Sequence, residues 1–397
     1  MKFGVPFAII YISAAFLPLL QAQSYYVDPR NGDDGGPGTH DAPFKTVAKA
    51  VAMVDGKGGE INLTPEGGPY RDSIIFHKGG TPDNPIILDG HGSVVNLGLD
   101  VTAGPWTKTD EGYVLEGPVQ PADLLVRADS RKIPADAPAG TRPVQENTRF
   151  YLATPVYING LSVVSDHVQP STAPRAWHGG YIVRYDDQGR LVIAFPKGLT
   201  PENSVVVLTG GANYMSCGVQ CMNANNVTIR NITSVFAPND GFNCHGSCQN
   251  IRMEHITALF NGDQGISSHE TCQVEVDDSE VAFNGTNDGS IEDVQQAVTT
   301  YRNLRVHQNR SLAFLFQQGH HILDRVVSWE NGKSNLPQPS EYTELTNCQD
   351  LGQIGADTQI PVIADANATP DPSVQVQETD RLGRFLQVRP PATTPSF

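Results

Sequence analysis

The chain has 397 residues and a formal net charge of −16, and its 38 Gly and 29 Pro favour turns and strands over helices. The charge excludes nucleic acid as the expected partner, because phosphate contacts require a basic face. It would also repel a polyanionic glycan unless a local basic patch or a cation intervened, and calcium is a candidate because hard cations prefer oxygen ligands.

The segment from Met1 to Ala22 has the pattern of a signal peptide, with MKFG, an apolar run and LQA before Gln23. This predicts an exported chain that is secreted or periplasmic. No later apolar run reaches the ~18 residues of a membrane span, so the mature chain is expected to lack one. Six cysteines in an exported chain could form disulfides, but the sequence determines neither their pairing nor the oligomeric state.

A short amphipathic helix is predicted from Thr46 to Val54, with Val47, Ala50, Val51 and Val54 on one face. The β-rich runs EINL, SIIFH, PIILDG and SVVNL follow it and are separated by Gly, Pro or Asn turns. We expect the helix to cap the end of a stack of coils.

Four pieces of this opening region carry a resemblance: Tyr26–Asp34 (YVDPRNGDD), Gly38-Thr39, Ala42–Thr46 (APFKT) and Gly80–Gly90 (GTPDNPIILDG). Together they resemble secreted right-handed parallel β-helix proteins of the pectin-lyase type. The resemblance implies an all-β, right-handed parallel β-helix. It identifies no reaction, because lyases, glycosidases and uncharacterised relatives share this opening.

Residues 104–204 interrupt the rhythm with hairpin-like strands and Pro-rich loops, among them YDDQGRLVIAF. We interpret them as an inserted β module between residues 23–103, the N-terminal cap and first coils, and residues 205–335, the main coils. A second independent domain is the alternative, and it is less favoured because the coil pattern resumes directly afterwards. Residues 336–397 are predicted to be an irregular C-terminal segment and tail.

The main coils repeat with a fixed period. Gly241, Gly265 and Gly289 form one equally spaced column, and Ala313 continues it. Apolar and polar residues alternate in each unit, and a unit cannot bury its apolar face alone, so neighbouring units must stack. Ile291 and Glu292 depart from the pattern, so a slip of register is expected after Gly289.

A second column contains His245 and His269, and Asp293 falls at its next position as its weakest member. A mixed cluster of histidines and acids supplies a group that gives or takes a proton and a partner that stabilises charge, as glycan cleavage requires. A structural ladder of histidines and Asn-Asp-Gly turns is an equally weighted alternative. The catalytic candidates are His245, His269, Glu270, Asp240 and Asp263, and the substrate-binding candidates are Asp288, Asp293 and Arg310.

Cysteines near these histidines have a spacing that is superficially typical of zinc sites. Column stacking explains them more simply, with Cys248 on Cys272 and Cys221 on Cys244. The identity of any metal is left unknown.

Glycoside hydrolysis is the slightly favoured function. Asp240, Asp263 and Glu270 are its candidate acid, base or nucleophile, and His245 and His269 would orient groups or transfer protons. The substrate would be an extracellular polysaccharide, which an extended array of coils suits.

Two alternatives stay open. A polysaccharide lyase or epimerase acting on uronates would use His245 or His269 as its base, because no lysine lies between Lys197 and Lys333, with Arg310 or calcium as neutraliser. For Arg310, a solvated turn residue is the more common role. A non-catalytic glycan-binding β-helix protein is the other alternative, and the sequence does not name the polysaccharide.

Overall fold

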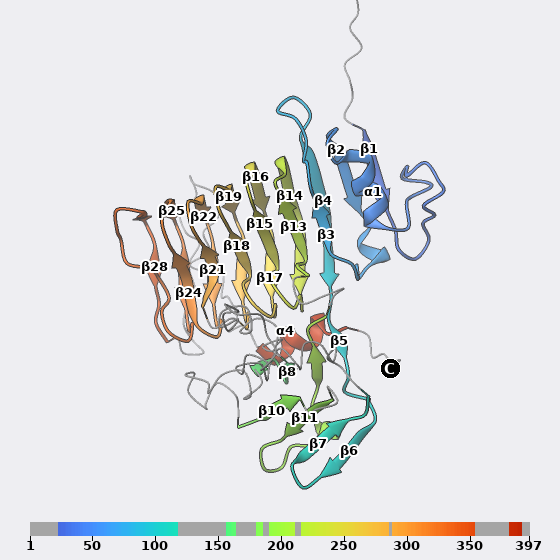
Figure 1. Ribbon diagram of the computed structural model, residues 1–397, viewed down its shortest axis with the longest axis vertical. Helices are drawn as coiled ribbons and strands as arrows, with labels where there is room; N and C mark the ends of the chain where they lie inside the picture. The colour runs from blue at the N-terminus through green and yellow to red at the C-terminus, as the bar shows by residue number, and fades with distance from the viewer. Residues whose placement is uncertain are drawn as a thin grey trace, which may run out of the picture.

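The computed structural model describes residues 23–117, 156–163, 180–185, 190–210, 216–285, 288–353 and 381–390. The predicted signal peptide and most of the predicted Pro-rich loops of the insert lie outside these residues. The described chain is almost entirely β and forms a parallel β-helix, so the predicted fold class is confirmed (Figure 1). No helix in the described ranges is long and apolar enough to cross a membrane.

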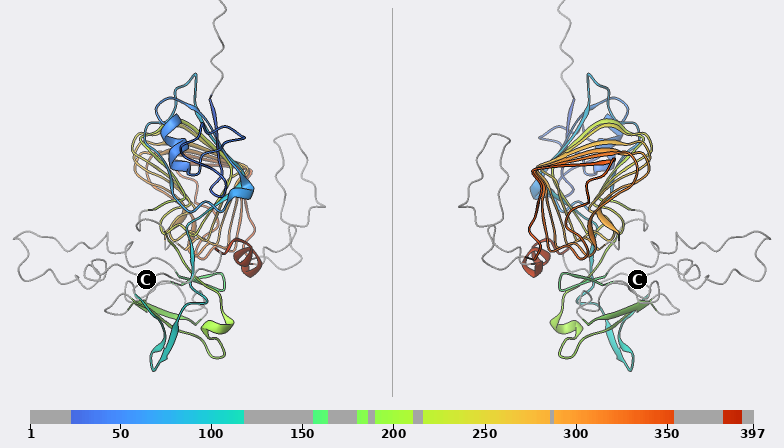
Figure 2. Two further views of the ribbon diagram at one scale, coloured as in Figure 1. Left: turned by 90° about the vertical axis from the view of Figure 1, so that its right-hand side faces the viewer. Right: turned by 90° about the vertical axis from the view of Figure 1, so that its left-hand side faces the viewer.

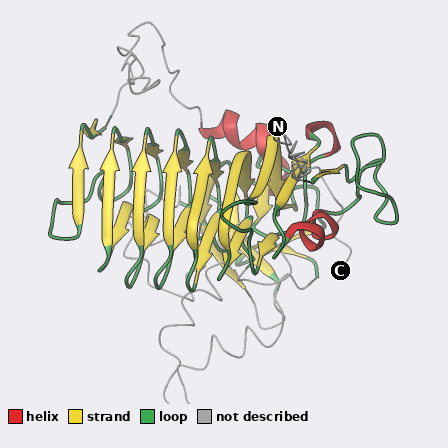
Figure 3. Cartoon of the chain, turned by 90° about the horizontal axis from the view of Figure 1, so that it is seen from above, coloured by secondary structure: helices red, strands yellow, loops and turns green. Residues whose placement is uncertain are grey.

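The coils stack through two parallel sheets, whose strands lie side by side in Figure 3. The larger sheet contains β1 (Ser24–Val27), β2 (Gly59–Leu63), β4 (Ile86–Asn96), β14 (Asn225–Val235), β16 (Gln249–Glu254), β17 (Thr257–Leu259), β19 (Gln273–Asp277), β20 (Glu280–Ala282), β22 (Val298–Arg302), β23 (Arg305–His307), β25 (His320–Asp324), β26 (Val327–Trp329), β27 (Thr343–Thr346) and β28 (Gln349–Asp350). The six-stranded sheet contains β3 (Ile74–Phe76), β13 (Val219–Met222), β15 (Phe242–His245), β18 (Ile266–Ser268), β21 (Gly289–Asp293) and β24 (Leu312–Phe316).

The long strands β4 and β14 divide the larger sheet into two branches. The first half of β14 pairs with β16, and its second half pairs with β17. Each coil from β15 to β26 therefore contributes one strand to each branch and one to the six-stranded sheet. The three faces surround the apolar core, and the view along the stack shows their arrangement (Figure 2).

The register of the six-stranded sheet corrects one predicted column. Ile266 pairs with Ile291 rather than with Ser290, the residue at the regular spacing, so the expected slip occurs between β18 and β21. The Gly265 amide consequently donates to the carbonyl of Ser290, and Gly289 pairs with Leu312. Gly289 therefore does not continue the glycine column, because the one-residue slip places Ser290 there instead.

Two ladders stabilise a corner of the coils. The buried amides of Asn261, Asn284 and Asn309 each donate to the Asn side chain of the next coil, at 2.9–3.0 Å. Phe260 and Phe283 stack with ring centroids 5.0 Å apart, so equivalent positions of neighbouring coils pack directly on one another.

Antiparallel strands from the predicted insert, together with β5 and β12 that flank it, form two further sheets. One contains β6 (Trp106–Thr109), β7 (Gly112–Leu115), β10 (Ile182–Tyr185) and β11 (Leu191–Ala194), and the other contains β5 (Leu99–Asp100), β8 (Val156–Ile158), β9 (Leu161–Val163) and β12 (Val206–Leu208). Their buried side chains, including Leu115 and Ile193, form a cluster separate from the coil core. Short 3-10 turns lie at Pro65–Gly67 and Pro201–Asn203. The division of the chain at residues 104 and 204 stays a prediction.

Helices lie at both ends of the described chain. The predicted N-terminal helix is α1 (Val47–Val54), which buries Val47, Ala50 and Val54 and begins after Thr46, whose side chain accepts from the Lys49 amide. Helix α4 (Arg381–Val388) was not predicted and packs along the lower edge of the coils in Figure 1. The coils also continue beyond residue 335, where the sequence predicts their end, because β27 and β28 pair with β25 and β26.

Candidate functional site

The side of the six-stranded sheet that faces away from the core carries a row of polar side chains, which we call the polar face; Asn243 and Ser267 in this row are buried, and Gln220 and Glu292 are partly exposed. Gln220, Asn243, Ser267 and Glu292 occupy equivalent positions on β13, β15, β18 and β21. Their neighbours in the strands, such as Phe242 and Ile266, point into the core, and alternation along a strand therefore directs the polar row outward. The row places amide, hydroxyl and carboxyl groups along successive coils.

A hydrogen-bond network fixes the acid Asp240 at the start of β15. Its carboxylate accepts from Asn243 Nδ2 and from Ser267 Oγ, both at 2.6 Å, and from the Gln264 backbone amide at 3.2 Å. Asp240 is 1% exposed, and burial raises the pKa of its carboxyl group against the opposing effect of these hydrogen bonds. Asp240 is thus positioned to hold its neighbours rather than to meet a substrate directly.

Gln264 joins two other acids of this face. Its Nε2 donates to Asp263 Oδ1 at 3.0 Å and to Glu292 Oε2 at 2.9 Å. Burial raises the pKa of Glu292 to about 8, and the negative charges of Asp288 and Asp240 add to the rise. Glu292 is partly exposed, and its raised pKa favours the protonated form of its carboxyl group near neutral pH.

The acids Asp240, Asp263 and Asp288 all lie at the corner where the chain enters the six-stranded sheet. We call this group, together with Glu292, the acid cluster. Because a one-residue slip separates β18 from β21, the outward position on β21 is held by Glu292. The structure therefore brings together three of the predicted acids and one that the sequence did not single out as a site residue.

The two histidines lie at the other end of the same strands. The rings of His245 and His269 stack with centroids 3.9 Å apart and planes inclined by 21°. Glu270 Oε2 lies 3.3 Å from His245 Nδ1 and accepts from the Gly246 amide at 2.7 Å. Burial lowers the pKa of His269 to about 4, assisted by the charge of His245 and opposed by Glu270. His269 is therefore neutral at pH 7.

One ligand atom from each of His245, His269 and Glu270 can be chosen so that all three lie within 4.8 Å of one another. They form the only group of three or more His, Cys, Asp or Glu with this spacing among the described residues. The predicted histidine column is thus confirmed as a spatial cluster, whereas its chemical role stays a prediction.

Asp293 does not belong to the histidine column, and this prediction was wrong. The slip of register pairs Asp293 with Ser268, which places its carboxylate inside the coil, fully buried. There it accepts from Thr299 Oγ1 at 2.7 Å and Tyr301 Oη at 2.9 Å, and lies 3.3 Å from His321 Nδ1. Asp293 is a core residue that a substrate cannot reach without opening the coil.

Arg310 is neither a solvated turn residue nor a neighbour of the histidines. It lies just before β24, where its Nη1 donates to the Gly285 carbonyl at 3.2 Å. The residue is 6% exposed, and burial lowers its pKa to about 10. The structure therefore places the expected neutraliser of a uronate at the opposite end of the strands from His245 and His269.

The six cysteines are all free thiols. Cys221 pairs with Cys244 in the register of β13 and β15, as predicted, and five of the six are buried. Cys221, Cys244, Cys248 and Cys272 belong to the apolar core, which explains their spacing without a metal.

Glu292 is the residue that sequence reasoning missed. The sequence marks its position as a departure from the repeat, but its charge is not weighed there as part of the site. A signal existed, because the inserted residue before Ile291 moves Glu292 into the column of Asn243 and Ser267. Its raised pKa depends on acids of other turns, which only the folded coils bring near it.

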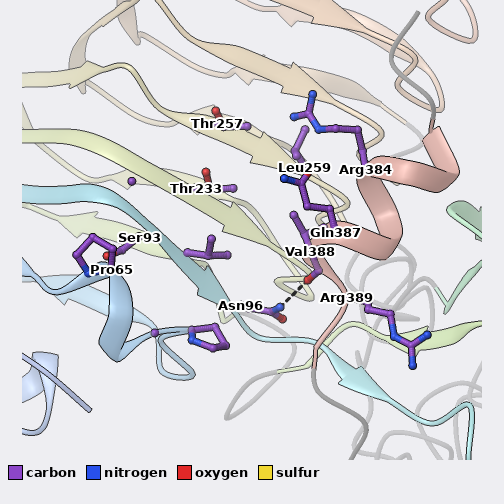
Figure 4. A pocket seen from close by; sticks show the side chains of 14 residues that line it. Pro65, Ser93, Asn96, Thr233, Thr257, Leu259, Arg384, Gln387, Val388 and Arg389 are labelled. Atoms are coloured by element: carbon purple, nitrogen blue, oxygen red, sulfur yellow. Dashed lines mark hydrogen bonds between the residues drawn. The ribbon is translucent and has the colours of Figure 1, made fainter. Parts of the chain in front are cut away.

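A separate groove lies between α4 and the second branch of the larger sheet, with a cavity volume of about 780 Å³ (Figure 4). The Asn96 side chain donates to the Val388 carbonyl at 2.8 Å at one end of it. Its basic side chains are paired, Arg384 with Glu280 and Arg389 with Asp100. The groove contains none of the predicted site residues and lies on a different surface from the polar face.

Comparison with known proteins finds solved structures with a similar fold but no relative by sequence. No family model matches the chain, and a search of curated proteins finds no match. Similar solved structures include a complex of XylC with xylose, at 13% identity and a TM-score of 0.47, with 83% of this chain and 68% of that chain covered. Pectate lyase Pel9A aligns at 14% identity and a TM-score of 0.34, covering 85% and 80%. A GH136 lacto-N-biosidase from Eubacterium ramulus aligns at 9% and 0.32, covering 83% and 55%. These low scores lend no function to this chain.

Proposed function

We propose that the chain is an exported carbohydrate-active enzyme that hydrolyses glycosidic bonds of an extracellular polysaccharide at the polar face. The observation that carries the proposal is the bridge from Gln264 to Asp263 and Glu292. Glycoside hydrolysis needs one carboxylic acid that protonates the leaving oxygen and one carboxylate that acts as nucleophile or base. Environments that separate the pKa values of two carboxyl groups assign these two roles.

Glu292 suits the acid role, because its pKa of about 8 keeps it protonated at neutral pH. Asp263, which is 9% exposed against 1% for Asp240, is then the nucleophile or base, and Asp240 positions Gln264 and Ser267 beside the pair. This proposal changes the roles of the residues that the sequence singled out. Asp263 keeps a direct catalytic role, and Asp240 and Asp288 act by raising the pKa of Glu292. The histidine cluster lies at the far end of the polar face and would contact the substrate there.

The spacing favours retention of configuration. Two oxygens that accept from one nitrogen at 3.0 and 2.9 Å can be no more than about 6 Å apart. Retaining glycosidases have carboxyl groups about 5 to 5.5 Å apart, and inverting ones about 6.5 to 9.5 Å. The pair fits the covalent route, in which Asp263 attacks the anomeric carbon while Glu292 protonates the leaving group.

The lyase or epimerase alternative has less support. A neutral His269 could accept a proton, but Arg310, the cation expected to neutralise the uronate, is buried at the other end of the strands. A non-catalytic glycan-binding protein would have no need for a protonated acid beside a second carboxylate.

A panel of neutral and acidic polysaccharides tests the proposal. We expect new reducing ends without an unsaturated, ultraviolet-absorbing product, and proton spectra of the first product with retained configuration. Asp263→Asn and Glu292→Gln should each abolish release, whereas His269→Ala and Glu270→Gln should leave the bond-breaking step in place. An unsaturated product lost in His269→Ala would favour elimination instead, and a folded protein that retards on glycan gels without any product would favour binding alone.

A further inference from the structure

We propose that His245, His269 and Glu270 form a binding site for a divalent transition-metal ion, with zinc as the representative ion. The site lies at the end of the polar face opposite the acid cluster. It does not depend on the proposed hydrolysis, because metal binding is measured without substrate.

The donor set is the first argument. Two imidazoles and one carboxylate are ligands that zinc takes in sites that keep a fourth, open position. Calcium instead takes six to eight oxygen ligands, so the two ring nitrogens select against it. The chain's net charge of −16 favours cations in general, and at this position the two imidazoles select a transition metal among them.

The geometry is the second argument. Ligand atoms of the three residues lie within 4.8 Å of one another. Two ligands bound about 2.1 Å from one tetrahedral zinc ion are about 3.4 Å apart, so the ligand atoms of the cluster must move closer together when the ion binds. Because the rings of His245 and His269 are inclined by only 21°, each ring must also rotate to aim its nitrogen at the ion. The side chains of His245 and Glu270 are 24% and 41% exposed, which leaves room for this rotation.

The backbone fixes the third ligand. The Gly246 amide donates to Glu270 Oε2 at 2.7 Å and so holds this carboxylate beside His245 Nδ1, 3.3 Å away. His245 and His269 come from adjacent coils, whose separation of about 4.8 Å is set by the sheet. The fold therefore presents both imidazoles and the carboxylate on one side of the coils, and solvent or a glycan oxygen can occupy the open position.

Two other histidines of the chain lie beside a single acid and serve as a comparison for the proposed metal site. His255 Nδ1 lies 2.9 Å from Asp278 Oδ2, and both side chains are exposed. His320 Nε2 lies 3.5 Å from Glu344 Oε1. Neither pair belongs to a group of three potential ligands among the described residues. His255 is therefore a matched control, since it offers the same two chemical groups without a second imidazole.

The test is zinc titration of the chelator-treated full chain by calorimetry, with bound metal measured after dialysis. A Cys348→Ser background removes the one cysteine that is not buried. We expect one zinc ion per chain, and affinity at least about tenfold weaker in His245→Ala, His269→Ala and Glu270→Gln. His255→Ala should bind as the background does, and circular dichroism checks the fold of every variant.

Two results would overturn the site. One is a background protein that retains no zinc after dialysis, and the other is equal affinity in the His269→Ala and His255→Ala variants. Cobalt(II) provides an independent readout, because its visible absorption reports nitrogen and oxygen coordination. Failure of every polysaccharide assay together with stoichiometric zinc binding would remove the proposed hydrolysis and leave the metal site standing.

Discussion

Two surfaces of the coils each contain a largely buried glutamate, and their environments are opposite. On the second branch of the larger sheet, Glu280 lies 3.0 Å from His307 Nε2 and 3.1 Å from Arg384 Nη2. Burial alone would raise the pKa of Glu280, but the hydrogen bonds and positive charges of these partners outweigh it and hold the pKa well below its ordinary value. On the polar face, Glu292 lies among other acids, and its pKa rises to about 8.

The difference separates a carboxylate that joins two elements from the one to which we assign the acid role in the proposed reaction. Glu280 joins α4 to the coils, because Arg384 comes from α4 and His307 from β23. Phe385 of the same helix is fully buried against Phe260 and Phe236, so the charges and the aromatic side chains act on the same contact. Glu292 lies instead among acids on the polar face, and a carboxyl group kept protonated in this way is typical of catalytic sites.

The largest expected effect is on catalysis at Glu292. Glu292→Gln removes the proton donor while keeping the side-chain size, so kcat should fall by about 10²- to 10⁴-fold. Reducing-end release on the best polysaccharide substrate measures it. The control is Glu344→Gln, since Glu344 is 65% exposed and lies on β27, in the larger sheet and not in the six-stranded sheet that carries the polar face. Equal activity of the two variants would move the acid role away from Glu292.

The next effect is on stability at Glu280. Glu280→Ala leaves Arg384 and His307 without their common partner, and breaking such a buried pair costs about 3 to 5 kcal/mol in free energy of unfolding. Urea unfolding measures the loss, and hydrolysis by the folded fraction should be unchanged. A loss below about 1 kcal/mol would mean that α4 is not held by these charges.

The dependence on pH should have opposite sign at the two glutamates. The raised pKa of Glu292 means that the folded chain binds a proton that the unfolded chain releases, so its contribution to stability is lost as pH rises from about 4.5 to about 8. Glu280 has a lowered pKa, and its contribution is present above about 4.5 and lost as pH falls below it. Urea unfolding across this range should show the decline for the parent chain and lack it for Glu292→Gln.

Activity gives the second readout of that titration. The acid form of Glu292 disappears above about pH 8, so kcat/KM should fall about tenfold per pH unit there. A limb near pH 5 instead would mean that Glu292 has an ordinary pKa in the working enzyme and that the surrounding acids do not hold its proton.

The repeat made the architecture predictable, because positions one period apart must stack if each coil is to bury its apolar side chains. His245 and His269 were therefore placed together correctly from spacing alone. The sequence showed a departure from the repeat near β21, where the register slips. It did not show what the slip does to Asp293, because a shift of one residue moves a side chain from one face of a strand to the other.

Other features depend on contacts distant in sequence. The sequence pattern around Arg310 is that of a surface turn, yet the residue is buried near Tyr157, which comes from the predicted insert. Helix α4 is short and contains Gly383, and its docking is decided by Phe385 entering the phenylalanine ladder. No local sequence pattern predicts either contact.

The smallest expected effect sharpens the comparison of charged pairs. Glu275 lies 3.7 Å from Arg252 and 3.8 Å from Arg302, and all three side chains are 40% exposed or more. Glu275→Ala should therefore lower the free energy of unfolding by no more than about 1 kcal/mol, and less at high salt, because water and ions screen exposed pairs. Glu275→Ala and Glu280→Ala should be measured in the same urea series. A similar loss of free energy of unfolding in both variants would show that coil stacking, rather than burial, determines how much a charged pair stabilises the chain. A loss confined to Glu280 would assign the stabilisation to the buried contact with α4.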